Sequence, residues 1–240
     1  MRMRTRFVIA ALAALVVAGA RPASAANIVL NGGFELGLVN WTVVDQAGGS
    51  GSWFLQTGTG SPLNGFAVGA PPQGSFAAMT DQGGPGSHVL YQDFVVPVGV
   101  SSASLDFQYF INNTAGAFFT PNSLDAFGGF ANQQARVDII TTSANVFSVA
   151  AGDVLLNLFQ TQVGDPLNQA YTLLSTDLTA FLQARAGQTL RLRFAEVDNQ
   201  LFFNLGIDAV LLDVETVPEP ATLLLVGSGA LAFVRRRRKA

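Results

Sequence analysis

The strongest constraint on the fold is a period of two residues in the segment 104–112, SLDFQYFIN. Every second side chain there is large and apolar, and the row comprises Leu105, Phe107, Tyr109 and Ile111. Alternate side chains of an extended strand point to opposite faces, so this row lies on one face. A helix would need apolar residues every three or four positions. The segment therefore predicts a strand with one buried face.

Short strands separated by Gly- and Pro-rich breaks extend through the middle of the chain. The sequence predicts further strands at residues 53–56, 75–80, 89–95, 135–141, 154–161, 189–197 and 206–215. In the strand at 189–197, three apolar residues alternate with Arg191 and Arg193, which is typical of a half-buried antiparallel sheet. Many short strands at close spacing predict an all-β fold, an antiparallel β-sandwich of the jelly-roll type, over residues 26–216.

Two segments of this middle domain do not read as strands. In residues 175–188, STDLTAFLQARAGQ, one of the first three side chains can cap a short helix that Gly187 ends. Residues 116–134 are rich in Phe, Asn and Gly, and they predict a long loop suited to binding.

The charge of the chain is segregated between its ends and its middle. Nine of the thirteen basic residues lie within the first 25 and the last six positions, whereas residues 26–217 hold fifteen acidic residues and four arginines. This middle domain therefore carries 11 negative charges in excess. Such a field repels phosphate backbones, so nucleic-acid binding is excluded.

The first 25 residues have the composition of a secretory signal peptide. Arginines precede an apolar run at 7–20, and Ala23, Ser24 and Ala25 form a small-residue cleavage site. Signal peptidase would cut after Ala25, and an uncleaved N-terminal anchor is the alternative. The chain has no cysteine, so its stability must come from the core or from a bound ion rather than from disulfides.

The middle domain resembles the galactose-binding-like jelly rolls, which include carbohydrate-binding modules. The resemblance rests on NIVLNGGFELGLVNW near the start and NLGIDAVLLDV near the end, with GSFAAM, LYQDFVVP, LDFQYFIN and QARVDI between them in order. In that family a structural Ca²⁺ ion commonly ties the first strand to the last. The matching positions are Glu35, Asp208 and a main-chain carbonyl near Gly33, which supply the hard oxygens that Ca²⁺ prefers. The alternative is that Glu35 and Asp208 only accept hydrogen bonds from nearby backbone.

The sequence does not indicate a sugar-binding or catalytic site. Trp41, Trp53, Tyr91, Tyr109 and Tyr171 are the rings available for stacking on sugars, and most such rings serve packing. No catalytic residue is predicted. The single histidine, His88, lies in a turn-like segment and is expected at the surface. Glu196 and Asp198, two apart at a strand end, are expected to be solvated.

The C-terminal tail combines three parts in order. Pro218, Glu219 and Pro220 precede an apolar segment at 221–234, and a basic cluster follows, comprising Arg235, Arg236, Arg237, Arg238 and Lys239. Fourteen helical residues reach about 21 Å, short of a hydrocarbon core of about 30 Å, so the segment predicts a short transmembrane helix with cations that stop translocation.

This tail, residues 217–240, resembles the bacterial PEP-CTERM sorting signal. The resemblance implies that exosortase, a membrane protease, recognises the tail, cuts near Pro-Glu-Pro and delivers the domain to the outer surface or matrix of a Gram-negative cell. A permanent inner-membrane anchor is the alternative.

Together these features predict an exported, non-enzymatic surface or biofilm-matrix protein. Its β-sandwich would bind Ca²⁺ and extracellular polysaccharide, and the chain would be anchored transiently in the inner membrane. A secreted carbohydrate-active enzyme and a purely structural matrix protein without ligand are the alternatives.

Overall fold

The computed structural model describes residues 24–217 as a β-sandwich. The predicted signal peptide lies almost entirely outside these residues, and the C-terminal apolar helix, Pro218–Pro220 and the basic cluster lie wholly outside them. Among residues 24–217, no helix is long and apolar enough to span a membrane.

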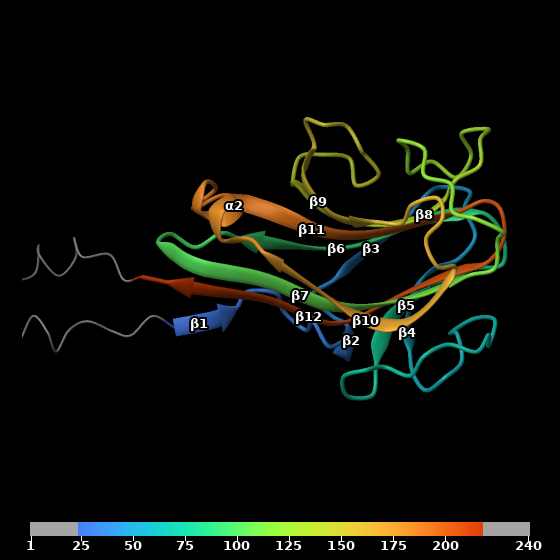
Figure 1. The fold of residues 1–240 in the computed structure, drawn as a ribbon, viewed down its shortest axis with the longest axis horizontal. Coiled ribbons are helices and arrows are strands. Elements are labelled where there is room, and N and C mark those ends of the chain that lie inside the picture. Colours follow the sequence, from blue (N-terminus) through green and yellow to red (C-terminus); the bar gives the residue numbers. More distant parts are fainter. Residues whose placement is uncertain (1–23, 218–240) are drawn as a thin grey trace, which may run out of the picture.

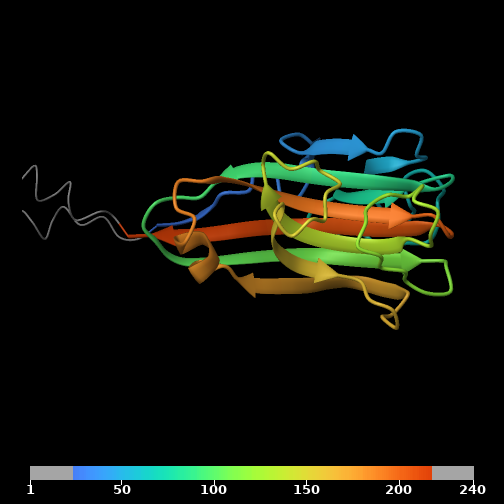
Figure 2. The ribbon, with the colours of Figure 1, turned by 90° about the horizontal axis from the view of Figure 1, so that it is seen from above.

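Two antiparallel sheets form the layers of the sandwich. The first sheet has the order β10-β7-β12-β5-β4, with β1 paired to β12, and the second has the order β3-β6-β11-β8-β9. The strand bounds are β1 Ser24–Asn27, β2 Glu35–Leu38, β3 Thr42–Asp45, β4 Ser52–Gln56, β5 Ala77–Asp81, β6 Gly86–Val95, β7 Val100–Asn113, β8 Gln133–Thr141, β9 Val154–Gln160, β10 Asn168–Asp177, β11 Thr189–Asp198 and β12 Phe203–Thr216. The long strands of both sheets run along the same axis (Figures 1 and 2). The predicted antiparallel β-sandwich is therefore confirmed.

The core lies between the inner faces of the two sheets. Leu105, Phe107 and Ile111 of β7 are fully buried in it, as their alternation predicts. Phe107 meets Phe194 of β11 edge to face, with 5.4 Å between ring centroids. Because aromatic rings bury large apolar areas, such contacts between the sheets contribute much of the stability.

The predicted strands all overlap observed ones, but four strands were missed. These are β1, β2, β3 and β10, three of which have only four residues. The predicted helical segment 175–188 is helical only at α2, Thr179–Gln183, because its first three residues complete β10. Oδ1 of Asp177 accepts a hydrogen bond from N of Thr179 at 2.8 Å, and Gly187 follows the helix with φ 78°.

The prediction of a half-buried sheet at β11 is wrong. The outer face of this strand is covered by residues 142–153, which connect β8 to β9. Arg193 is fully buried there, and its Nη1 donates to the carbonyl oxygens of Val146 and Ser148, both at 2.7 Å. Alternation places Arg193 on the outer face correctly, but the connection removes that face from water.

The described chain begins and ends at one end of the sandwich, and the opposite end holds other strand ends. Ser24 of β1 pairs with Thr216 of β12, so the described chain enters and leaves at the same end. The first residues of β6 and the last residues of β11 lie at the opposite end (Figure 1). We call this opposite end the distal end.

Candidate functional site

Two acidic side chains from the first and last parts of the domain contact one loop. Oδ2 of Asp208, in β12, accepts a hydrogen bond from N of Gln73 at 2.9 Å. Oε1 of Glu35, the first residue of β2, accepts from the N atoms of Ser75 and Phe76 at 2.9 and 3.0 Å. The structure thus brings Glu35 and Asp208 to the loop that precedes β5.

The two carboxylates of this junction influence each other electrostatically. Burial raises the pKa of Asp208 to about 6, the N–H groups of Gln73 and Ala209 oppose this shift, and the negative charge of Glu35 adds to it. Oε1 of Gln73 lies 2.8 Å from the position of a Cβ on Gly33, so an amide oxygen faces Gly33. Carboxylate and amide oxygens suit Ca²⁺. The same carboxylates accept hydrogen bonds from the N–H groups of the loop. This backbone role without a metal is the alternative that the sequence also allows.

A second group of polar side chains is buried between the sheets at the distal end. His88 of β6 lies opposite Glu196 of β11 in the sheet register, and Asp198 follows on the same face. None of the three is more than 3% exposed. One ligand atom from each lies within 4.8 Å of the other two. We call these three residues the distal cluster.

The distal cluster has polar atoms without hydrogen-bond partners. Both carboxylate oxygens of Glu196 and Nε2 of His88 have none within residues 24–217, although Oδ1 of Asp198 accepts from N of Gly86 at 3.1 Å. Burial and the charge of Asp198 raise the pKa of Glu196 well above its usual value, and burial raises that of Asp198 to about 8. Buried polar groups normally have hydrogen-bond partners. The unpaired atoms of this cluster therefore lower the stability of the folded state.

The predictions for the distal cluster are wrong. His88 was expected at the surface, and Glu196 and Asp198 were expected to be solvated, yet all three are buried. A signal was present in the sequence, because Glu196 and Asp198 continue the alternate row to which the core residue Phe194 belongs. Because alternate residues of a strand share a face, Glu196 and Asp198 lie on the same inner face as Phe194.

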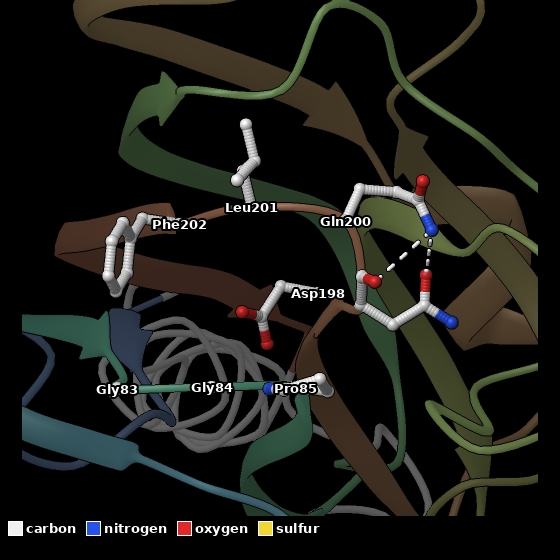
Figure 3. A pocket seen from close by; sticks show the side chains of 8 residues that line it. Gly83, Gly84, Pro85, Asp198, Gln200, Leu201 and Phe202 are labelled. Atoms are coloured by element: carbon white, nitrogen blue, oxygen red, sulfur yellow. Dashed lines mark hydrogen bonds between the residues drawn. The ribbon is translucent and has the colours of Figure 1, made fainter.

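A pocket opens at the surface beside Asp198, one member of the distal cluster. It has a volume of about 160 Å³ and is lined by residues 83–85, before β6, by Asp198 at the end of β11, and by residues 199–202, between β11 and β12. Figure 3 shows the carboxylate of Asp198 between Phe202 and the Gly83–Pro85 segment. Asp198 is therefore the member of the cluster that can be reached from solvent.

The aromatic rings named as candidates for sugar stacking are mostly packed. Trp41 and Trp53 are buried. The guanidinium of Arg191 lies 3.8 Å above the ring of Tyr91, and Tyr109 and Tyr171 pack against the phenylalanines Phe159 and Phe110. Among residues 24–217, the exposed aromatic rings lie instead in the long loop between β7 and β8, and they are Phe119, Phe127 and Phe130. The sequence marked this loop by its composition but did not single out these rings.

The last residues of the chain match a family model, the PEP-CTERM protein-sorting motif, over residues 216–239. The chain carries a PEP-CTERM sorting motif. This motif indicates an exported protein that is anchored transiently through its C-terminal region. No curated protein sequence matches the chain.

Solved structures similar to this chain include carbohydrate-binding modules and an adhesin domain. TmCBM61 in complex with β-1,4-galactotriose has 12% sequence identity and a TM-score of 0.46, over 78% of this chain and 97% of the module. The K3 cleaved adhesin domain of Lys-gingipain from Porphyromonas gingivalis W83 has 15% identity and a TM-score of 0.45, over 78% of this chain and 98% of that domain. A family 4 carbohydrate-binding module has 16% identity and a TM-score of 0.40, over 77% and 97%.

Proposed function

We propose that this chain is an exosortase-sorted protein of the cell surface or extracellular matrix, with a non-catalytic β-sandwich that binds Ca²⁺ and associates with polysaccharide. The observation that carries the proposal is the sorting motif at residues 216–239. A chain delivered by such a motif functions outside the cytoplasm, where polysaccharide is abundant.

The arrangement of the termini supports a role in presenting the distal end outward. The described domain ends at the same end of the sandwich at which it begins, while the long loop before β8 and the pocket at Asp198 lie at the distal end (Figure 1). A domain held through its C-terminus would therefore turn the distal loops away from the attachment point.

Exposed aromatic rings on the long loop support contact with sugars. Phe119, Phe127 and Phe130 are between 37% and 51% exposed, and an exposed apolar ring can pack against the apolar face of a sugar. The acidic surface of the domain repels acidic glycans, which makes neutral polysaccharides the expected ligands at low salt.

The buried positions of the carboxylates support the non-catalytic part of the proposal. Hydrolysis of a glycoside by two carboxyl groups requires both to reach the scissile bond. Glu196 is fully buried, and only Asp198 of the pair meets the pocket. A polysaccharide chain cannot contact both groups in this arrangement.

The test is an association assay with the processed protein extracted from cell surfaces. We expect retention on neutral polysaccharide without release of reducing ends, and weaker retention of the Phe127→Ala variant. Leu201→Ala, which removes an exposed apolar side chain outside the long loop, is the matched control. Release of sugar would show an enzyme, and no retention on any polysaccharide would leave the purely structural alternative.

A further inference from the structure

Three potential metal ligands converge in the distal cluster without contacting one another through hydrogen bonds. Ligand atoms of His88, Glu196 and Asp198 lie within 4.8 Å of one another. Nitrogen and oxygen ligands bind Zn²⁺ at about 2.0–2.2 Å in tetrahedral geometry, so two ligands of one ion lie about 3.3–3.6 Å apart. Side-chain movements of about 1 Å would therefore bring all three onto one ion.

A carboxylate holds the imidazole ring of His88 in the way that metal-binding histidines are held in proteins. Its Nδ1 lies 2.8 Å from Oδ1 of Asp45, and Oδ2 of Asp45 accepts from the hydroxyl of Ser52 at 2.8 Å. When a carboxylate accepts a hydrogen bond from the N–H of one ring nitrogen, the other nitrogen of the neutral ring keeps a free lone pair, which is how metal-bound histidines are held. Nε2 of His88 is that other nitrogen, and it is buried without a partner.

Space beside Nε2 is kept free by a glycine. A Cβ on Gly86 would lie 2.5 Å from Nε2 of His88 and 2.6 Å from the carbonyl oxygen of Ser50. Any side chain at position 86 would therefore fill the region that Nε2 faces. Glycine at this position avoids that contact.

We propose that His88, Glu196 and Asp198 bind one divalent first-row transition-metal ion of the Zn²⁺ or Mn²⁺ type. Two carboxylates neutralise its charge, and the imidazole nitrogen favours such an ion over Ca²⁺, which prefers oxygen ligands. Gln82 adds a further donor beside Asp198, since its buried Oε1 also has no partner within residues 24–217. The pocket at Asp198 gives the ion a route from solvent.

The ion would link two neighbouring strands of the second sheet at the distal end. His88 lies in β6 and the two acids lie in β11, so one ion crosslinks neighbouring strands at the place where both approach the distal end. This site is separate from the junction of Glu35 and Asp208, which offers only oxygen ligands. The competing account is a pair of carboxyl groups that share a proton and bind no metal.

The composition of the chain allows a direct test on the full-length protein. The chain has one histidine and no cysteine, so every imidazole signal comes from His88. Full-length protein in detergent, labelled with ¹⁵N-histidine and stripped with a chelator that is then removed, is titrated with Zn²⁺. We expect one ion retained per chain after desalting and a shift of the Nε2 resonance that is complete at one equivalent.

Two variants separate metal binding from folding. Glu196→Gln should weaken Zn²⁺ binding more than tenfold, and in chelator it should melt at or above the temperature of the unaltered protein, because a buried carboxylate is removed. Asp45→Asn, which changes the group behind the imidazole, should weaken binding by about 10- to 100-fold. Glu215→Gln, which changes an exposed glutamate at the opposite end of the sandwich, is the matched control and should bind Zn²⁺ as the unaltered protein does.

Either of two results overturns the proposal. One is an unchanged Nε2 resonance in excess Zn²⁺, even where ions are retained, because these ions would then lie elsewhere. The other is equal Zn²⁺ affinity of the Glu196→Gln variant and the unaltered protein. Both results would support the shared-proton account.

Discussion

Arg193 and Asp138 form an ion pair from which water is excluded, since neither side chain is exposed. They lie opposite each other on β11 and β8, on the outer face of the second sheet. Asp138 also accepts two hydrogen bonds from Arg136, both at 2.7 Å, and one from Nδ2 of Asn157 at 2.8 Å. A single carboxylate therefore holds together β8, β9 and β11 beneath the connection at residues 142–153.

Removing this carboxylate should destabilise the domain strongly. Asp138→Ala leaves Arg193 buried without its ionic partner, so we expect a loss of about 3–5 kcal/mol in the free energy of unfolding. Urea denaturation measures it. Asp93→Ala is the matched control, because Asp93 pairs with Arg191 but is 37% exposed, and it should cost less than about 1 kcal/mol. Equal losses of unfolding free energy in the two variants would contradict the claim that burial makes the Arg193–Asp138 pair more important than the exposed pair.

The same carboxylate should make stability fall in acid. Burial tends to raise the pKa of Asp138, but the hydrogen bonds and charges of Arg136 and Arg193 outweigh it, and the pKa lies below its usual value. The unfolded chain therefore binds the proton more readily than the folded one below pH of about 4. The stabilisation is complete above this pH and is lost as pH falls through the folded pKa. Asp138→Asn should flatten this dependence in denaturation series between pH 2 and 5 relative to Asp93→Asn.

Ca²⁺ should stabilise the domain through Glu35 and Asp208. At about 100 times its Kd, an ion that binds only the folded state adds about 2.7 kcal/mol. Calorimetry in Ca²⁺ and in chelator should show a higher melting temperature with Ca²⁺, and Asp208→Asn should remove the difference. Glu196→Gln, which leaves this junction intact, should retain it. Identical melting curves in Ca²⁺ and chelator would argue against the site.

Processing at both ends should be visible in the mature protein. The small-residue site at 23–25 and the sorting motif at 216–239 predict that surface-extracted protein lacks peptides before Ala26 and beyond the Pro-Glu-Pro region. Mass spectrometry of this protein measures both ends. Replacing Glu219 by Ala should leave the C-terminal arginines on the protein, and recovery of those arginines without the replacement would rule out exosortase cleavage.

Prediction from sequence succeeded where the evidence is local. The alternation in residues 104–112 marked β7 and its buried row, and the composition of residues 116–134 marked the long loop. The four-residue strands β1, β2 and β3 were missed because so short a segment carries too little periodicity to distinguish it from a loop.

The sequence alone determined the periodicity of β7 and β11, the face on which each of their side chains lies, and the sorting motif of the tail, because all of these are properties of contiguous residues. Only the tertiary structure decided which polar side chains are buried. Arg193 and Glu196 lie three positions apart on opposite faces of β11, and both are fully buried. One is covered by the connection at residues 142–153 and the other by the facing sheet. Burial depends on segments that are remote in the chain, so no pattern within β11 could show that both faces are closed to water.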